Sequence, residues 1–482
     1  MGKLKVIDFV VYRWRYSIGY IAVALLLIAL LIIAGFFVPN GLTEQEKSSV
    51  VSSSNLSIQH FNPTMILNAP YHILQKLSFH TFGISNISIK LPSLIIALFS
   101  AIGMVALLRS WFKQNVALLG VLLAITTGQF LLIAQTGTPA ILYIFWSVWL
   151  LLSASMVSKS ARFLFIWKVL LFAFIALSLY TPFSIYILAT LLVATFLHPH
   201  LRHTISELSK IKLSIASLAA LVLVAPIVYA IYLQPSIVLQ LLGIPSHVPA
   251  LFGNLHQLFT QYLDFFHPLN GILMTPIYGL SSVLLMAIGL YRMFTTKYTA
   301  KSYILSGLLL LLIPIVILNP DIVSITFVPF MLLTALGIDY LIRYWYRLFP
   351  NNPYARIAGL VPLVILIASM TLSGLERYVY GYYYGEGVAS SFSKDLTLLK
   401  TELADSPKPT ALIVSPSERS FYETFVKYDQ TNNLTIGTIY GAPVASVIFT
   451  HDARLKNALA GASKVITNDY SHDADRFYVY KK

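Results

Sequence analysis

Residues 17–38 read SIGYIAVALLLIALLIIAGFFV and contain no charged side chain. A membrane-spanning helix needs about 20 mostly apolar residues, so this stretch predicts a helix that crosses a bilayer. A cleaved signal peptide has a shorter apolar core and a small-residue cleavage site. Because the sequence Pro39-Asn40-Gly41 follows a longer core here, we interpret residues 17–38 as a retained first span.

Ten further apolar stretches follow the first. The chain is 57% hydrophobic and 11% charged, whereas soluble domains carry about 25% charged residues. Its mean hydropathy is +0.75, and the absence of cysteine excludes disulfides and thiolate metal sites. We therefore expect an α-helical polytopic membrane protein with about 11 spans, near 17–38, 89–108, 115–135, 138–157, 163–179, 181–198, 213–233, 273–292, 302–318, 322–342 and 357–374.

The basic residues predict how these spans are oriented. Lys and Arg are retained in cytoplasmic loops, and 18 of them fall on the side of the N-terminus in the alternating loops. The opposite side holds four before the tail, namely Lys47, Lys76, Lys90 and Arg377. We expect a cell-membrane protein with a cytoplasmic N-terminus and an extracytoplasmic C-terminus. Since topology accounts for most of the net charge of +14, nucleic acid is not an expected partner.

Three segments on the outer side are long enough to fold. The first loop, 39–88, holds amphipathic stretches near 44–54 and 64–80, and the second, 234–272, holds one near 251–266 that is typical of an interfacial helix. From Glu386 onward the tail carries 11 basic and 11 acidic residues, as a soluble domain would. We expect a transmembrane module over 1–384 and a small α/β domain over 385–482, with strands near 411–414, 434–440, 446–450, 464–467 and 476–480 and helices near 418–428 and 454–459.

The first outer loop opens with two glutamates close to the membrane. Thr43 and Glu46 have the spacing of a helix capping box, in which each side chain binds the backbone of the other residue. Alternatively, Glu44 or Glu46 is a general base that takes a proton from an acceptor hydroxyl. The sequence leaves both interpretations open.

The few outer cations are candidates for binding a lipid phosphate. Lys76 lies in the first loop, Lys90 at the start of the second span, and Arg377 just after the last span. Ammonium and guanidinium groups form strong charge-assisted hydrogen bonds with phosphate, although the same side chains also extend to membrane interfaces for structural reasons. The segment 378–384, YVYGYYY, is typical of an aromatic belt at the headgroup level.

The order of motifs resembles that of GT-C-type membrane glycosyltransferases, which include protein mannosyltransferases and the aminoarabinose transferase of lipid A. In that family an outer-loop Asp-Glu pair precedes a Pro-containing helix, a Gly-containing turn and an Arg-Leu-Pro-Ser entry into the second span. The corresponding segments here are Leu42-Thr43-Glu44-Gln45-Glu46, Ala69-Pro70-Tyr71-His72, Phe82-Gly83-Ile84-Ser85 and Lys90-Leu91-Pro92-Ser93.

The resemblance implies a glycosyltransferase that moves a sugar from a polyprenyl-phosphate carrier to an envelope acceptor on the outer face. It implies Glu46 or Glu44 as the catalytic base, Lys90, Lys76 and Arg377 as ligands of the phosphate or lipid, and Tyr71 and His72 as substrate contacts. It implies no certain cofactor and leaves a divalent cation open. Gln45 stands where the family has its aspartate, and Lys90 replaces an arginine.

Those departures favour an alternative function. A chain that kept the fold and lost the base would be a scaffold or a lipid-binding envelope protein. A transporter is the least favoured class, because Asp339 is the main charged residue inside the predicted spans.

Overall fold

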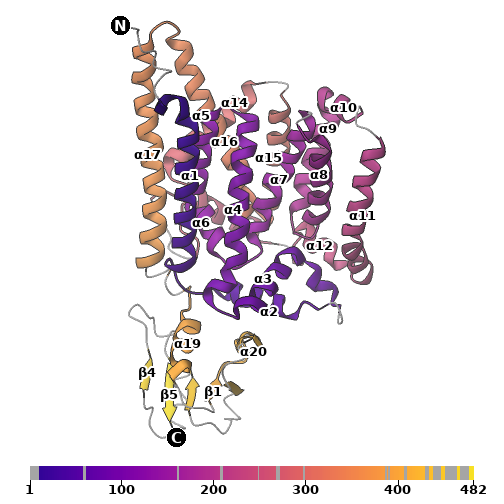
Figure 1. Ribbon diagram of the computed structural model, residues 1–482, viewed down its shortest axis with the longest axis vertical. Coiled ribbons are helices and arrows are strands. Elements are labelled where there is room, and N and C mark those ends of the chain that lie inside the picture. The colour runs from indigo at the N-terminus through magenta and orange to yellow at the C-terminus, as the bar shows by residue number, and fades with distance from the viewer. Residues whose placement is uncertain are drawn as a thin grey trace.

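The computed structural model is an elongated helical bundle with a small sheet-containing domain at one end (Figure 1). We call the end of the bundle that carries residues 385–482 the tail side. The structure describes residues 10–57, 61–159, 162–206, 210–247, 249–266, 272–296, 299–385, 388, 391–405, 410–428, 434–437, 447–450, 464–466 and 477–481.

The helices of the bundle lie where the apolar stretches predict them. In the described part of the chain, seven are long and apolar enough to cross a membrane: α1 (Val10–Phe36), α4 (Asn86–Trp111), α7 (Ala140–Ser158), α11 (Lys210–Leu233), α15 (Ala300–Leu318), α16 (Ser324–Leu348) and α17 (Pro353–Tyr384). The other predicted spans correspond to a bent pair, α5 (Gln114–Ile125) with α6 (Gly128–Gln135), and to the shorter apolar helices α8 (Leu164–Ser178), α9 (Ser184–Leu197) and α14 (Leu280–Thr295). The number of membrane crossings stays a prediction.

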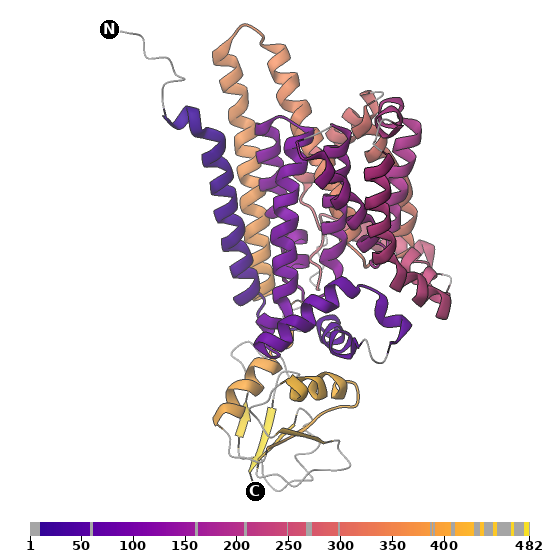
Figure 2. The same ribbon diagram turned by 45° about the vertical axis from the view of Figure 1, so that its right-hand side comes forward.

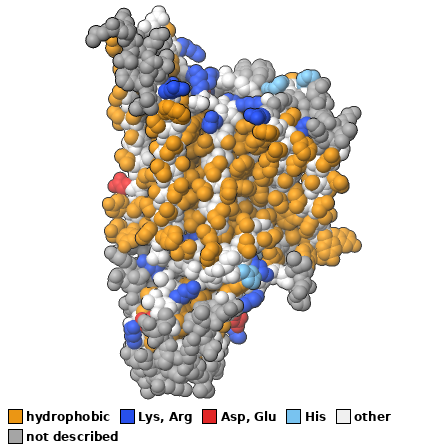
Figure 3. All heavy atoms as spheres, in the orientation of Figure 1, with side chains coloured by type: hydrophobic (Ala, Val, Ile, Leu, Met, Phe, Trp, Pro, Cys, Tyr) orange, Lys and Arg blue, Asp and Glu red, His pale blue; other side chains and the backbone are white. Residues whose placement is uncertain are grey.

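The surface of the bundle agrees with a bilayer environment. Figure 3 shows a belt of apolar side chains around its middle, with Lys and Arg gathered at the end opposite the tail. Many large apolar residues in this belt are exposed, among them Leu218, Val222 and Leu310. A soluble protein rarely exposes an apolar surface of this extent, so the chain is an α-helical membrane protein.

The third predicted span is not one straight helix. α5 and α6 meet at an angle of 58°, and two threonine hydroxyls bind the backbone at the junction. The Thr127 hydroxyl accepts from the Phe130 amide at 3.3 Å and thereby starts α6. The Thr126 hydroxyl donates to the Leu122 carbonyl at 2.9 Å and the Thr127 hydroxyl to the Ala124 carbonyl at 2.7 Å, which satisfies the end of α5.

Two of the bundle helices approach each other through paired glycines. A Cβ atom on Gly289 of α14 would lie 1.9 Å from the Leu333 carbonyl oxygen of α16, and one on Gly337 of α16 would lie 2.2 Å from the Leu285 carbonyl oxygen. No other residue fits at such distances. Small residues allow this close backbone packing, which is common between helices in membranes.

The two loops that we expect on the outer side contain helices, as predicted. The first loop forms α2 (Glu44–Asn55), a 3-10 turn (Pro63–Ile66) and α3 (Ala69–Phe82), which lie beneath the bundle on the tail side (Figure 2). The second loop forms α12 (Ser236–Leu242) and α13 (Leu251–Leu263), and the apolar face of α13 is exposed, with Phe252 at 89%. A short helix that the sequence did not suggest, α10 (Pro199–Ser206), lies at the other end.

The tail forms a five-stranded mixed sheet in the order β2-β1-β3-β5-β4. The strands β1 (Thr410–Ile413), β2 (Leu434–Gly437) and β3 (Val447–Thr450) are parallel, whereas β5 (Phe477–Lys481) is antiparallel to β3 and to β4 (Lys464–Ile466). Helices α19 (Asp395–Asp405) and α20 (Arg419–Tyr428) pack against the sheet. The predicted strands and the helix at 418–428 are confirmed within a few residues, and the helix expected at 454–459 lies outside the described residues.

The tail domain is bound to the first outer loop. The backbones of Leu42 and Ser393 exchange two hydrogen bonds of 2.8 and 2.9 Å in a β-bridge. One apolar core joins Val50 and Phe79 of the loop helices with Phe421 and Phe425 of α20. The loop and the tail domain therefore share a hydrophobic core on the tail side of the bundle.

Candidate functional site

Glu46 is the capping residue that the sequence suggests. It is fully buried, and its Oε2 atom accepts from the Thr43 amide at 2.8 Å and from the Thr43 hydroxyl at 3.1 Å, while the Thr43 hydroxyl accepts from the Glu46 amide at 3.2 Å. Its Oε1 atom accepts from the Gly137 amide at 2.7 Å. One carboxylate oxygen therefore caps α2, and the other holds α2 against the turn between α6 and α7.

Gln75 is the centre of a second buried network. Its Nε2 donates to the carbonyls of Ile89 and Gly137, both at 3.1 Å. Its Oε1 must then accept, and the hydroxyls of Ser49 and Ser53 donate to it at 2.9 and 2.5 Å. This one side chain joins α2, α3, α4 and the turn before α7.

The same network fixes the state of His72. Because the Ser53 proton points to Gln75, the His72 Nδ1 that lies 2.7 Å from the Ser53 hydroxyl carries a hydrogen and donates it. Burial lowers the pKa of His72 to about 4, so the ring is neutral at pH 7. Tyr71 is also fully buried, and its hydroxyl lies 2.9 Å from that of Ser93. Both predicted substrate contacts are thus packed into the junction of the loop with the bundle.

The predicted cations of the first loop have structural surroundings. Lys90 is buried at the start of α4, where the charge of Glu46 acts on it, and the Lys76 ammonium donates to the Leu56 carbonyl. Glu44 differs from these residues, since its side chain is 80% exposed and binds the Lys47 ammonium at 2.8 Å. Glu44 is therefore the predicted base that solvent can reach.

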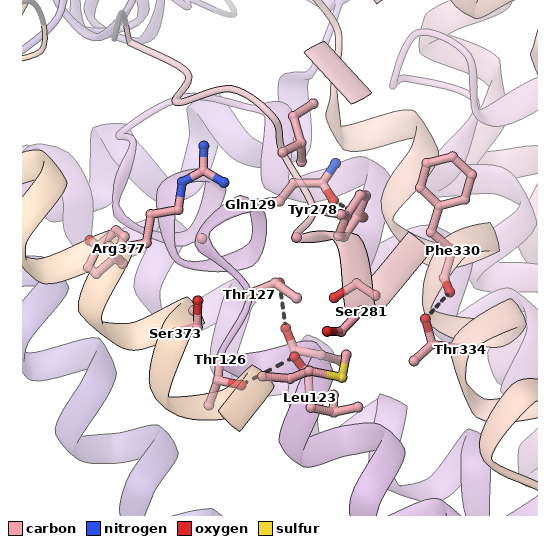
Figure 4. Close-up of a pocket in the computed structure, with 18 of the residues that line it drawn as sticks. Leu123, Thr126, Thr127, Gln129, Tyr278, Ser281, Phe330, Thr334, Ser373 and Arg377 are labelled. Atoms are coloured by element: carbon pink, nitrogen blue, oxygen red, sulfur yellow. Dashed lines mark hydrogen bonds between the residues drawn. The ribbon is translucent and has the colours of Figure 1, made fainter. Parts of the chain in front are cut away.

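A cavity with many polar lining residues lies in the bundle, beside the α5–α6 bend. Its volume is about 340 Å³, within the range of ligand sites. It is enclosed by α5, α6, α14, α16, α17 and the segment before α14 (Figure 4). Its polar lining residues are Thr126, Thr127, Gln129, Tyr278, Ser281, Ser282, Thr334, Ser369, Ser373, Arg377, Tyr378 and Tyr382.

Arg377 gives this cavity its positive charge. Figure 4 shows it on α17 above Ser373, across the cavity from Ser281 and Tyr278. A guanidinium has five N–H donors, and among the described residues the Pro276 carbonyl is its acceptor. Donors therefore remain for an anion. No Asp or Glu is among the described residues that line the cavity.

A hydrogen-bonded wall closes one side of the cavity. The Tyr278 hydroxyl donates to Gln129 Oε1, and Gln129 Nε2 donates to the Val323 carbonyl at 2.6 Å. On the side toward the tail, the Tyr378 hydroxyl donates to Gln135 Oε1 at 2.7 Å. Gln135 lies just before the turn at Gly137 that binds Glu46. This segment therefore lies between the cavity and the hydrogen-bond network of the first loop.

Of the residues that line the cavity, the sequence drew attention to Arg377 and to the Tyr-rich segment 378–384, and it gave no indication of the others. The uncharged residues Thr127, Gln129 and Ser373 lie in stretches that read as apolar spans. The signal that could have indicated them is the row of polar residues Thr126, Thr127 and Gln129 within one span. Among the described residues, no three His, Asp or Glu side chains are grouped as metal ligands would be.

Comparisons with known proteins agree with this architecture. The family model described as dolichyl-phosphate-mannose-protein mannosyltransferase matches residues 70–229, about a third of the chain. ArnT from Cupriavidus metallidurans in the apo state superimposes with a TM-score of 0.54 at 13% identity, covering 96% of this chain and 98% of ArnT. ArnT bound to undecaprenyl phosphate gives a TM-score of 0.54 at 13% identity, with coverages of 97% and 98%.

The chain has the fold of the GT-C-type membrane glycosyltransferases. The oligosaccharyltransferase of Archaeoglobus fulgidus, tethered with an acceptor peptide, shares this fold with a TM-score of 0.53 at 12% identity. That alignment covers 89% of this chain and 64% of the oligosaccharyltransferase. The curated proteins give no sequence match. The family model ends before residues 273–282 and 369–382, which contribute to the lining of the cavity beside the α5–α6 bend.

Proposed function

We propose that this GT-C protein is a glycosyltransferase that takes a sugar from a polyprenyl-phosphate carrier and passes it to an envelope acceptor on the tail side of the membrane. The observation that carries the proposal is the partly buried Arg377 guanidinium in a bundle cavity of about 340 Å³ that no described Asp or Glu lines. A lipid phosphate needs a cation at the depth of the headgroups, and Arg377 supplies one just after the last predicted span.

Arg377 is the proposed phosphate ligand, with Ser373 one turn before it on α17 and also in the lining. A guanidinium holds a phosphate with two parallel hydrogen bonds, which also fixes its orientation. Lys76 and Lys90 are weaker candidates, since Lys76 binds the Leu56 carbonyl and Lys90 is buried. ArnT has a crystal structure with bound undecaprenyl phosphate, and the archaeal oligosaccharyltransferase AglB has a structure in complex with an inhibitory peptide and a dolichol-phosphate. These structures support a carrier of this class here.

Glu44 is the proposed base. It is exposed on the first turn of α2, and it can accept a proton from an acceptor that approaches from the aqueous side. In this proposal residues 1–384 form the membrane module and 385–482 an extracytoplasmic domain that contacts the acceptor. The N-terminus is then cytoplasmic, as the distribution of Lys and Arg predicts.

A lipid-binding scaffold without catalysis is the second candidate. It is favoured by the three hydrogen bonds that Glu46 accepts and by the uncharged lining of the cavity around Arg377 among the described residues. In this case the carrier would bind at Arg377 and no sugar would be transferred.

Carrier binding and sugar transfer, measured separately on the purified full-length protein, distinguish the two. Arg377→Gln should weaken binding of undecaprenyl phosphate, whereas Arg419→Gln on the exposed face of α20 should not. Glu44→Gln should keep binding and lose transfer from undecaprenyl-phosphate sugars to an envelope extract. If the wild type binds the carrier but transfers no sugar, the scaffold is supported. If Arg377→Gln and Arg419→Gln change carrier binding equally, the Arg377 site is ruled out.

A further inference from the structure

Lys47 is a cation of the first loop to which the proposed function gives no role. It lies on α2 three residues after Glu44, and its side chain is only 7% exposed, whereas that of Glu44 is 80% exposed. A buried ammonium is costly unless opposite charges and hydrogen-bond acceptors compensate it. The partners of Lys47 therefore indicate what keeps it in this position.

Those partners come from two parts of the protein. Lys47 donates to Glu44 Oε1 at 2.8 Å within α2. Its ammonium also lies 3.7 Å from Oε1 of Glu418, the residue directly before α20 in the tail domain. The charge of Asp395, the first residue of α19, acts on Lys47 as well. Figures 1 and 2 show α20 next to the helices of the first loop. One ammonium thus joins the proposed base to carboxylates of the tail.

The tail holds Lys47 in a defined place. Glu418 is itself fixed, because its Oε2 atom accepts from the Ser415 hydroxyl at 3.0 Å and its side chain is only 21% exposed. An exposed Glu–Lys pair on a helix is worth a few tenths of a kcal/mol and leaves both side chains mobile. Lys47 differs from such a lysine, since it is buried against the tail and cannot follow the motions of Glu44.

This arrangement puts the two oxygens of the Glu44 carboxylate in different states. Oε1 accepts from Lys47, whereas Oε2 has no partner in the described part of the chain. A general base needs an oxygen that is free to take a proton and that lies within hydrogen-bond reach of it. A carboxylate held by a fixed cation at one oxygen has fewer orientations to lose and presents the other oxygen to the acceptor.

We propose that Lys47 is the positioning residue of the base Glu44, and that the tail domain orients this base by fixing Lys47 through Glu418. This inference rests on the proposed function, because it takes Glu44 as the base. It gives the tail a part in the chemical step besides any contact with the acceptor. Sugar transfer then depends on the contact between the tail and the first loop, whereas carrier binding at Arg377 does not.

The test measures transfer and carrier binding by the full-length protein in nanodiscs, with undecaprenyl-phosphate sugars as donors and an envelope extract as the acceptor. Lys47→Met removes the ammonium and keeps an apolar stem, and Glu418→Gln removes the tail carboxylate and keeps Lys47. We expect each variant to lower kcat by about 10- to 100-fold and to leave the KM for the donor unchanged. Binding of undecaprenyl phosphate should also stay at the wild-type level. Glu423→Gln on the exposed face of α20 is the matched control.

A further variant distinguishes positioning from a general loss of stability. Lys47→Arg keeps a positive charge between the two carboxylates, so it should recover most of the kcat that Lys47→Met loses. A purely structural role would lower kcat, carrier binding and the fraction of folded protein together, and Glu418→Gln would then show no selective loss of kcat.

The outcomes separate this inference from the proposed function. If Glu44→Gln loses transfer while Lys47→Met and Glu418→Gln behave like the control, the base stands and the positioning role is overturned. If Lys47→Met weakens carrier binding as much as it lowers kcat, or if Lys47→Arg recovers nothing, the positioning role is also overturned. If Glu44→Gln transfers sugar at the wild-type rate, or if the wild type transfers none, the proposed base fails and the inference fails with it.

Discussion

Glu46 and Gly137 lie 91 residues apart in the chain, yet the Glu46 Oε1 atom accepts a hydrogen bond of 2.7 Å from the Gly137 amide. With the capping box on its other oxygen, this contact makes Glu46 a structural joint between α2 and the bundle. A carboxylate is suited to this joint because it offers acceptors on both sides and no donor.

Replacement of Glu46 by Gln should therefore destabilise the protein. The amide NH₂ would face either the Gly137 or the Thr43 amide, and one buried N–H would lose its acceptor at a cost of about 1–3 kcal/mol. The measurement is the thermal unfolding midpoint of the purified protein in detergent. Glu423→Gln is the control, since the Glu423 side chain is 52% exposed and pairs with the exposed Arg419. Equal midpoints for the two variants would contradict the joint.

His72 should make the stability dependent on pH below neutrality. Burial lowers its pKa from 6.5 to about 4, so between these values the unfolded chain binds a proton that the folded chain does not. Stability is then complete above pH 6.5 and falls as the pH drops toward 4, by up to about 3 kcal/mol. His72→Gln should reduce the difference between unfolding midpoints at pH 7 and pH 5, whereas exposed His80→Gln should not. An unchanged pH dependence in His72→Gln would show that other groups cause it.

Alanine at Gly289 should force α14 and α16 apart. The added Cβ would lie 1.9 Å from the Leu333 carbonyl oxygen, a backbone atom that cannot rotate away. We expect a loss of about 1–3 kcal/mol and a smaller fraction of monodisperse protein on size-exclusion chromatography. Gly253→Ala is the control, because its nearest contact, the Ala250 Cβ atom, would be at 3.6 Å. If both variants behave as the wild type does, the two helices are not packed this closely.

Lys47 should hold the tail domain to the first loop. Its side chain is buried, and its ammonium lies 2.8 Å from the Glu44 carboxylate and 3.7 Å from the carboxylate of Glu418 in the tail. Burial alone would lower its pKa, but the hydrogen bond to Glu44 and the charges of Glu44, Glu418 and Asp395 raise it overall. A raised lysine pKa means that the stabilisation is complete at neutral pH and is lost only as the pH rises through that pKa.

Lys47→Met should therefore speed hydrogen–deuterium exchange in α20 and β1 at pH 7, because Glu418 would remain at the interface without its partner. Arg419→Met removes a cation from an exposed pair with Glu423 and serves as the control. Exchange in α20 that is equal in the two variants would mean that the apolar core alone holds the domain.

The fold could be predicted from the sequence because apolar length and turn chemistry are local properties. The stretch 17–38, the capping residues Thr43 and Glu46, and the apolar strands of the tail each carry their own signal. The bend at Thr126 and Thr127 was missed, since two threonines among apolar residues also fit an ordinary span, and hydroxyls can bind the preceding turn without breaking it.

The site was harder to predict because it depends on distant pairs. In the sequence, Glu46 fits the role of a base and the role of a capping residue, because nothing there indicates that Gly137 lies beside it. Arg377 stood out because cations are scarce on its side of the predicted bundle. The cavity residues Gln129 and Tyr278 come from segments far away in the chain. The Tyr-rich segment is also divided by the helix period: Tyr378 and Tyr382 face the cavity, whereas Tyr380 and Tyr384 are exposed.

The shared core of the first loop and the tail has a consequence for biosynthesis. A chain is made from its N-terminus, so α2 and α3 exist long before Ser393, Glu418 and Phe425, with which they pack. Until the tail has been synthesised, Val50 and Phe79 lack these partners. The core that the loop shares with the tail can therefore form only after the last bundle helix has been made, and a chain that stops short of the tail leaves the apolar face of the loop uncovered.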